Sequence, residues 1–196
     1  VRVYQRKWKN YADQYHYAQG KCLKTWILRL DADEYIDNFP IPIKNGVYGY
    51  FVKRYIIFND EVVRYGGAST WQLRFYRKDR GAIENSWMDE HILVDGKVLK
   101  SQAVIYDNNL NDLNWWHRKH LSYSDREIKD LNDIKHKRHG LHASARFKRS
   151  VKHLFLKNWG FTGATILFLI KYFFMLGIFD SKGARAFHFF QGFWYR

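Results

Sequence analysis

The sequence is poor in residues that identify several common classes of protein. It has one cysteine, Cys22, among 196 residues, so an internal disulfide is impossible and nothing indicates an oxidising compartment. It has only two prolines, whereas apolar residues make up 46% and aromatic residues 19% of the chain, a composition that argues against global disorder. We therefore expect a folded protein with a substantial hydrophobic core, in a reducing cytoplasm.

Long apolar runs are also missing. The most apolar stretch, residues 164–177 (ATILFLIKYFFMLG), is interrupted by Lys171 and is shorter than the roughly 20 residues that cross a bilayer. The first residues, VRVYQRKW, contain neither the apolar stretch nor the small-residue cleavage site of a signal peptide. We expect residues 164–177 to lie in a membrane interface or to pack against protein.

Acidic residues are scarce relative to basic ones, 19 against 33, which gives a formal net charge of +14. Positive charge of this size attracts the phosphates of nucleotides, nucleic acids or anionic lipids, and the sign alone does not distinguish them. Basic residues crowd the segment 144–158, where Phe147, Val151, Leu154 and Phe155 share one helical stripe. Such a helix is typical of proteins that lie along an anionic membrane surface. No RNA-recognition, zinc-finger or helix-turn-helix motif is present, so we do not expect nucleic acid as a partner.

The chain has two regions with different patterns. Residues 1–134 combine short strands, from Trp26 to about Asp107, with a helical pattern from Leu113 onward. Residues 135–196 form a basic and aromatic tail of amphipathic helices. The sequence therefore predicts an α/β domain, residues 1–134, followed by a helical tail, residues 135–196.

Three strand patterns stand out within the first region. Residues 46–58 (GVYGYFVKRYIIF) predict one strand. Residues 71–77 (WQLRFYR) alternate apolar and polar, which predicts a half-buried strand with Arg74 on its polar face. Asp95 and Gly96 stand between two apolar runs, which predicts that these two runs pair as a hairpin.

The apolar segment WILRL is followed by three carboxylates, Asp31, Asp33 and Glu34. An EF-hand is excluded because Ile36 occupies the position that requires glycine. One alternative is that these acids begin a helix and face the positive end of its dipole. The other is that WILRL is an interior strand whose carboxyl end opens into a ligand crevice, where two aspartates in an extended segment point the same way and serve one metal-phosphate site.

Several segments, taken in order, resemble a known family. LDADE after an apolar strand, WQLRFYRKDRGAIENSWMDEH (residues 71–91) and DNNLNDLNWWHRKHLSYSDREI (residues 107–128) are similar to the family-2 glycosyltransferases of bacterial lipopolysaccharide, capsule and exopolysaccharide synthesis. The resemblance covers nearly the whole chain and implies a GT-A-like mixed sheet, with residues 10–21 as the helix before the D-x-D strand. The first strands and helices of that family have no counterpart before Val1, so we expect a truncated GT-A fold or a degenerate gene product.

The resemblance implies roles for the acidic cluster. Asp33 would be a direct ligand of a divalent metal, manganese or magnesium, and Asp31 would contact the metal or the ribose. Asp107, at the end of an apparent strand, would be a later ligand of the metal or the acceptor. Such a metal stabilises the negative charge that develops on a nucleoside diphosphate leaving group.

Inverting transfer also needs a base that removes the proton of the acceptor hydroxyl. The segment WMDEH supplies Asp89 and Glu90, and the resemblance favours Glu90; the alternative is a surface acidic pair beside a hairpin. Arg74 and Arg77 are candidates for holding the diphosphate or an anionic acceptor. Their alternative is solvation or pairing with Glu84.

Together these expectations describe an inverting glycosyltransferase. It would move a sugar from a nucleotide-diphosphate donor to a lipid-linked or lipopolysaccharide-type saccharide, on the inner face of the bacterial cytoplasmic membrane. Its C-terminal helices would contact the membrane surface. The alternatives are a non-catalytic basic protein that binds nucleic acid and a membrane-associated remnant.

Overall fold

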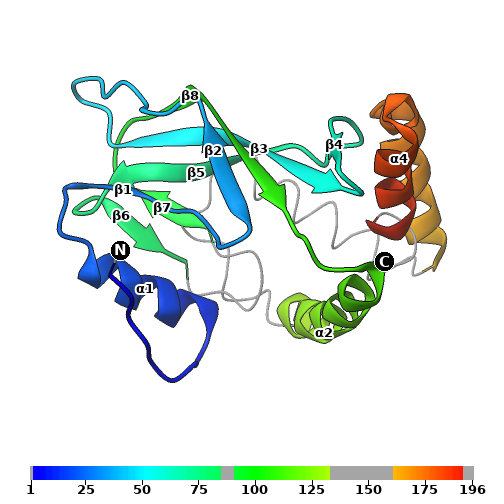
Figure 1. The fold of residues 1–196 in the computed structure, drawn as a ribbon, viewed down its shortest axis with the longest axis horizontal. Helices are drawn as coiled ribbons and strands as arrows, with labels where there is room; N and C mark the ends of the chain where they lie inside the picture. The colour runs from blue at the N-terminus through cyan, green and yellow to red at the C-terminus, as the bar shows by residue number, and fades with distance from the viewer. Residues whose placement is uncertain (1, 85–90, 133–160, 192–196) are drawn as a thin grey trace.

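The computed structural model describes residues 2–84, 91–132 and 161–191 (Figure 1). Its centre is a mixed six-stranded sheet in the order β1-β5-β3-β8-β2, with β4 paired to β3. Of these pairs only β3 and β8 run parallel. The strands of this sheet are β1 (Trp26–Leu28), β2 (Glu34–Asp37), β3 (Gly49–Phe58), β4 (Glu61–Val63), β5 (Thr70–Arg77) and β8 (Val98–Asn108).

Helices stand at both ends of the sheet. Helix α1 (Tyr11–Lys21) contacts β6 (Gly81–Ile83), which forms a separate antiparallel pair with β7 (Ile92–Val94). Helix α2 (Leu113–Asn132) follows β8, and α4 (Lys182–Phe189) lies beside β4 at the other end (Figure 1). The described chain is therefore a mixed α/β protein with C-terminal helices, as the sequence predicts.

Local residue chemistry accounts for the boundaries of α1 and of the β3–β4 hairpin. The Asn10 side chain accepts a hydrogen bond from Asp13 N at 2.7 Å and so caps the first turn of α1. Asn59 and Asp60, which end β3, both have positive φ, the conformation that a tight two-residue hairpin requires and that these residue types tolerate. The strand predicted at residues 46–58 is confirmed as β3.

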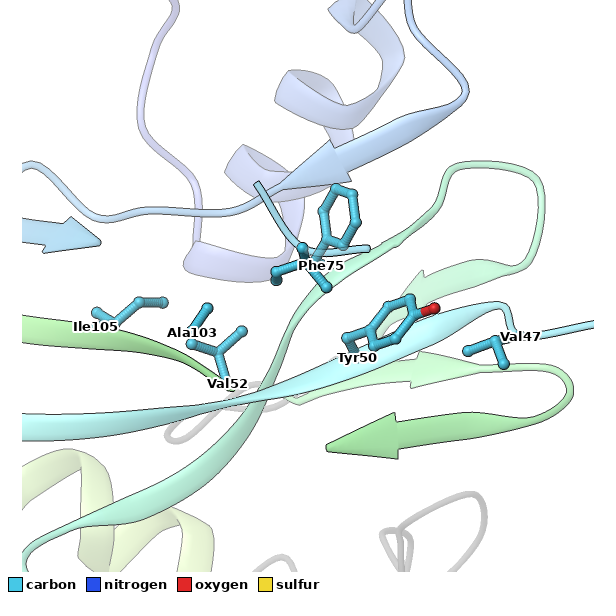
Figure 2. Packing of buried hydrophobic residues seen from close by; sticks show 7 residues of the cluster. Val47, Tyr50, Val52, Phe75, Ala103 and Ile105 are labelled. Atoms are coloured by element: carbon cyan, nitrogen blue, oxygen red, sulfur yellow. The ribbon is translucent and has the colours of Figure 1, made fainter. Parts of the chain in front are cut away.

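One core cluster lies on the sheet where β3, β5 and β8 meet. Figure 2 shows Tyr50 and Val52 of β3 near Phe75 of β5 and Ala103 and Ile105 of β8. Val52 and Ile105 have no exposed surface. Burial of such side chains stabilises the sheet by about 1.5–3 kcal/mol each.

The predicted polar face of residues 71–77 is wrong in the second half of β5. Tyr50 pairs with Phe75 and Phe51 with Leu73, so Arg74 is an extra residue that forms a β-bulge. The bulge breaks the alternation, and both Arg74 and Tyr76 are buried. Tyr76 O–H bonds to Gln19 of α1, and burial raises the pKa of this phenol to about 12.

The hairpin predicted at Asp95 and Gly96 is also wrong. The chain does turn there, with Gly96 at φ +119, but β7 pairs with β6 and β8 pairs with β3 and β2. The turn motif indicates a change of direction. It cannot determine which strand each run meets, because that choice depends on distant parts of the chain.

The described part of the tail packs against the sheet. Residues 161–169 are helical and lead into a π-helical turn, η2 (Ile170–Phe174), and a short 3-10 helix, η3 (Gly177–Phe179). Val63 of β4 forms a small buried cluster with Ala184 and Phe187 of α4. In the described chain no helix is both long and apolar enough to cross a membrane. The basic amphipathic helix predicted at residues 144–158 lies outside the described residues.

Candidate functional site

The three clustered carboxylates lie in a turn, which we call the acidic turn (Asp31–Glu34). Glu34 N donates to Asp31 O at 3.0 Å, and β2 begins at Glu34. Both alternatives from the sequence are therefore wrong in detail: no helix begins here, and β1 ends at Leu28 on the edge of the described sheet. Because β1 and β2 occupy opposite edges, the connection between them has to cross the sheet, and the acidic turn belongs to that crossing.

Glu34 is the buried centre of this turn, with 1% of its side chain exposed. Its Oε1 accepts hydrogen bonds from Arg54 Nε at 2.9 Å and Arg74 Nη2 at 2.7 Å. Its Oε2 accepts one from Asp31 N at 3.0 Å. Charge-assisted bonds of this kind are about twice as strong as neutral ones, and here they hold the turn against strands β3 and β5.

The bulge in β5 places Arg74 in this network. Arg74 O accepts a hydrogen bond from Arg29 N at 2.8 Å, and Arg74 Nε donates to Gln72 at 2.9 Å. Burial lowers the pKa of Arg74, and the carboxylate of Glu34 opposes that effect. Nη1 of Arg74 is buried and has no hydrogen-bond partner within the described part of the chain. The two N–H groups of this nitrogen therefore lack acceptors, and an unpaired polar group that is buried lowers the free energy of unfolding.

Asp31 lies between two guanidinium groups. Its oxygens are 3.6 Å from Arg29 Nη2 and 3.7 Å from Arg74 Nη2, distances too long for hydrogen bonds, and 37% of its side chain is exposed. The Arg29 guanidinium lies 3.6 Å above the ring of Tyr15, which fixes its position from α1. Asp31 therefore remains accessible to solvent, and the two positive charges of Arg29 and Arg74 exceed its own single negative charge.

Asp33 and Asp107 form the other side of the turn. Asn108 N donates to Asp33 O at 2.8 Å, which brings the end of β8 against the turn. Asp107 pairs with Arg54 and faces Glu34 across β2 and β8. Desolvation raises the pKa of Asp107, with Arg54 opposing and Asp33 adding to the rise. The side chain of Asp33 is exposed and forms no ion pair with any residue that the structure describes.

The donor set can be tested against a divalent cation. Among residues 2–84, 91–132 and 161–191, no three His, Cys, Asp or Glu side chains are grouped to hold a metal. Magnesium, however, commonly binds through one or two carboxylates together with substrate phosphates. Asp33, and Asp31 as a second ligand, fit that mode, whereas Asp107 is committed to Arg54.

A cleft of about 480 Å³ adjoins this network. Arg54 and Asp107 belong both to the network and to the cleft wall, and α2 and α4 supply the facing walls through Trp116 and Phe187. Sites for small ligands usually occupy roughly 300–1,000 Å³. The partners of the acidic turn, Arg54 and Asp107, thus border a cavity of the size that a ligand needs.

No family model matches this chain, and no curated protein is significantly similar to it.

The residues predicted from the sequence divide into three groups. Asp31, Asp33, Arg74 and Asp107 are brought together. Arg77 is not, because it forms a bidentate pair with Asp79 at 2.7 and 2.9 Å on the surface. Asp89 and Glu90 lie outside the described residues.

Two central residues of the network were missing from the predicted site. The sequence indicates Glu34 only as one of three clustered acids and Arg54 only as part of a strand. Lys53 and Arg54 interrupt the otherwise apolar run YFVKRYIIF, and this is the available indication, because a cation that is buried in a sheet needs an acidic partner.

Proposed function

We propose that this chain is part of an inverting glycosyltransferase with a GT-A-like fold. It moves a sugar from a nucleoside diphosphate donor to a lipid-linked or lipopolysaccharide-type saccharide. The observation that supports this proposal is the acidic turn, in which buried Glu34 is locked by Arg54 and Arg74 while Asp31 and Asp33 stay accessible to solvent. Arg54 of this network also lines the cleft.

The residues of the turn suit a diphosphate. Asp33 and Asp31 would hold the divalent cation, magnesium or manganese, which supplies positive charge to the leaving diphosphate. Arg29 and Arg74 add two guanidinium groups within 4 Å of Asp31, and guanidinium geometry matches phosphate oxygens. Glu90 is proposed as the base that takes the proton from the acceptor hydroxyl, by resemblance alone.

Asp33→Asn is expected to lower metal-dependent affinity for a nucleoside diphosphate at least tenfold and to abolish sugar transfer. The reason is that it removes the exposed carboxylate without disturbing the buried network. Binding is measured by isothermal titration of UDP, GDP, ADP and dTDP with and without MnCl₂. Asp37→Asn removes the same charge from an exposed site on β2 and should change nothing.

Glu90→Gln separates binding from chemistry. It should abolish transfer and leave diphosphate affinity unchanged. Failure of all four nucleotides to bind, or equal metal-dependent binding by the wild type and Asp33→Asn, would overturn the proposal.

The tail supports placement on a membrane surface. Between the helical residues 161–169 and α4, a group that we call the apolar elbow is exposed: Phe173, Phe174, Met175, Leu176 and Phe179. Phe174 and Phe179 are 83% and 72% exposed. Lys182 and Arg185 follow on α4 and are exposed as well. Apolar side chains flanked by cations fit the interface of an anionic bilayer.

The double substitution Phe174→Ser and Phe179→Ser is expected to reduce binding to vesicles that contain anionic lipid at least tenfold, because each phenylalanine adds roughly 1.5–3 kcal/mol when buried. Vesicle sedimentation at fixed salt measures the effect. Leu23→Ser with Leu110→Ser, two equally exposed positions elsewhere, is the matched control. Unchanged vesicle binding, or tighter retention on an oligonucleotide than on vesicles, would contradict the membrane assignment and favour the basic nucleic-acid binder.

A further inference from the structure

One face of the central sheet carries aromatic and basic side chains that have no role in the proposal above. Successive residues of a strand point to opposite faces of a sheet. Arg54 of β3 bonds Glu34 on one face, so its neighbours Lys53 and Tyr55 point to the other. Strand register places further residues beside them. The whole group, which we call the tyrosine–lysine face, comprises Tyr35 of β2, Lys53 and Tyr55 of β3, Trp71 of β5, and Lys100 and Tyr106 of β8.

The three tyrosines form a stacked row across neighbouring strands. The rings of Tyr35 and Tyr106 are 5.1 Å apart between centroids at an interplanar angle of 21°, and those of Tyr55 and Tyr106 are 6.0 Å apart at 24°. Because β8 lies between β2 and β3, Tyr106 has a ring on each side. Within the described part of the chain none of these three phenol groups forms a hydrogen bond, so each is available to donate and to accept one.

Two lysines add positive charge beside the row. Lys53 Nζ lies 5.4 Å and Lys100 Nζ 5.0 Å from the centroid of the Trp71 ring, and Trp71 is 38% exposed. These cation–π contacts position the ammonium groups without neutralising them. Neither lysine forms an ion pair with any residue in the described ranges. Asp37 of β2 shares this face and adds one negative charge, so the positive charges of the two lysines exceed it.

The arrangement of the rings restricts what this face can bind. Single-stranded nucleic acids stack their bases on open aromatic faces, whereas both faces of Tyr106 contact other rings and two ammonium groups approach the Trp71 ring. The face instead offers hydroxyl groups and cations over about 14 Å, the distance from β2 to β5 across three strand spacings. Sugar hydroxyls and carboxylates suit these groups, because a phenol both donates and accepts and a charged partner strengthens the hydrogen bond.

We infer that the tyrosine–lysine face binds an anionic polysaccharide, with sugar hydroxyls bonded to the row of tyrosines and carboxylates facing Lys53 and Lys100. No residue of this face belongs to the acidic turn or lines the cleft. Binding therefore needs neither nucleotide nor metal. The inference goes beyond the proposed function and does not rest on it.

Binding of short oligosaccharides to the whole chain tests the inference. Hexagalacturonate, maltohexaose, galacturonate and a thymidylate hexamer are titrated by isothermal calorimetry at fixed salt. Hexagalacturonate is expected to bind at least tenfold more tightly than the neutral maltohexaose and than monomeric galacturonate, because it alone meets both the tyrosines and the lysines along the face. The thymidylate hexamer, an anionic chain with few sugar hydroxyls, should bind at least tenfold more weakly than hexagalacturonate. Equal affinity for the charged and the neutral hexasaccharide would contradict the inference.

A paired substitution distinguishes this face from the net positive charge of the whole protein. Lys53→Gln with Lys100→Gln is expected to weaken hexagalacturonate binding at least tenfold and to bring it within threefold of maltohexaose binding. Lys24→Gln with Lys44→Gln removes the same charge from exposed positions elsewhere and should weaken it by no more than threefold. Equal losses for the two pairs would show that the polysaccharide is attracted by net charge and would overturn the inference.

The hydroxyl groups are tested without any change of charge. Tyr55→Phe with Tyr106→Phe keeps the stacked rings and should weaken hexagalacturonate binding at least threefold. Tyr4→Phe with Tyr65→Phe, at exposed positions elsewhere, should leave it unchanged. Unaltered affinity after loss of the hydroxyls of Tyr55 and Tyr106, or thymidylate binding as tight as that of hexagalacturonate, would also overturn the inference. Because no nucleoside diphosphate or metal is present, this failure is distinct from failure of UDP binding at Asp33.

Discussion

Glu34→Ala is expected to lower the free energy of unfolding by about 3–5 kcal/mol, the range typical of breaking a buried ion pair from one side. Glu34 is 1% exposed and accepts from both Arg54 and Arg74. Without it, the buried guanidinium of Arg74 keeps only its hydrogen bond to Gln72 at 2.9 Å and the longer approach to Asp31 at 3.7 Å. Denaturant unfolding followed by tryptophan fluorescence measures the loss.

Two variants make this expectation specific to the buried network. Glu34→Gln keeps the shape and one oxygen acceptor, so it should lose less than Glu34→Ala. Asp33→Asn, in the same turn but exposed, should change the free energy of unfolding by no more than about 0.5 kcal/mol. A loss below about 1 kcal/mol for Glu34→Ala would show that the two arginines are satisfied by water and that the turn is not anchored as described.

The structure also explains why the apolar segment WILRL is followed directly by three carboxylates. WILRL is apolar because Ile27 packs in the core beside α1, and Trp26 stacks on Phe75 at 4.8 Å between ring centroids. The carboxylates follow at once because the chain leaves the sheet after Leu28. Glu34 of the acidic turn is then stabilised by Arg54 of β3 and Arg74 of β5, which are distant from it in sequence.

Sequence patterns predicted the elements with strong local determinants. Strand β3, with its turn at Asn59, is of this kind, whereas helix α1 was expected only from the resemblance. Patterns failed where one residue changes the register. The bulge at Arg74 reverses the alternation of β5, and periodicity alone does not reveal an inserted residue.

Partners that are distant in sequence set the other limit on prediction. The role of Glu34 depends on Arg54 and Arg74, 20 and 40 residues away, and on a sheet order that separates β1 from β2. The spacing of residues within one segment does not show which residues of distant segments will contact it. The acids could therefore be recognised as candidates, while the division between the buried anchor and the accessible carboxylates could not.

Besides the residues of the tail that line the cleft directly, one loop joins the tail to the cleft. Gly66 and Gly67 line the cleft, and Gly66 N donates to Met175 O of the apolar elbow at 2.9 Å. A side chain is not tolerated at Gly66, since its φ is +62 and a Cβ would lie 2.3 Å from His188. Under the proposed function, contact of the elbow with a membrane would therefore bring the cleft close to the lipid-linked acceptor.

Asp180→Ala is expected to loosen this connection and to lower the free energy of unfolding by about 3 kcal/mol. Asp180 accepts from Arg64 N at 3.0 Å and Tyr65 N at 3.1 Å, and it bonds His188 Nε2 at 2.7 Å. The side chains of Asp180 and His188 are each 2% exposed. Truncation leaves the buried His188 ring without its partner, a loss of roughly 1–3 kcal/mol, and it also removes the acceptor of Arg64 N and Tyr65 N; the effects are not fully additive.

Amide hydrogen exchange distinguishes a local latch from a general loss of packing. In Asp180→Ala, the amides of residues 64–67 should exchange at least tenfold faster, while those in the centre of β3 change only with global stability. Asp37→Ala, an exposed aspartate on β2, is the control and should leave both measurements unchanged. A double-mutant cycle with His188→Ala should give a coupling energy of about 1 kcal/mol or more, because the two side chains share one buried hydrogen bond. Additive effects with unaltered exchange at residues 64–67 would mean that Asp180 does not fasten this loop to the tail, and that packing such as that of Ala184 and Phe187 on Val63 holds the tail to the sheet instead.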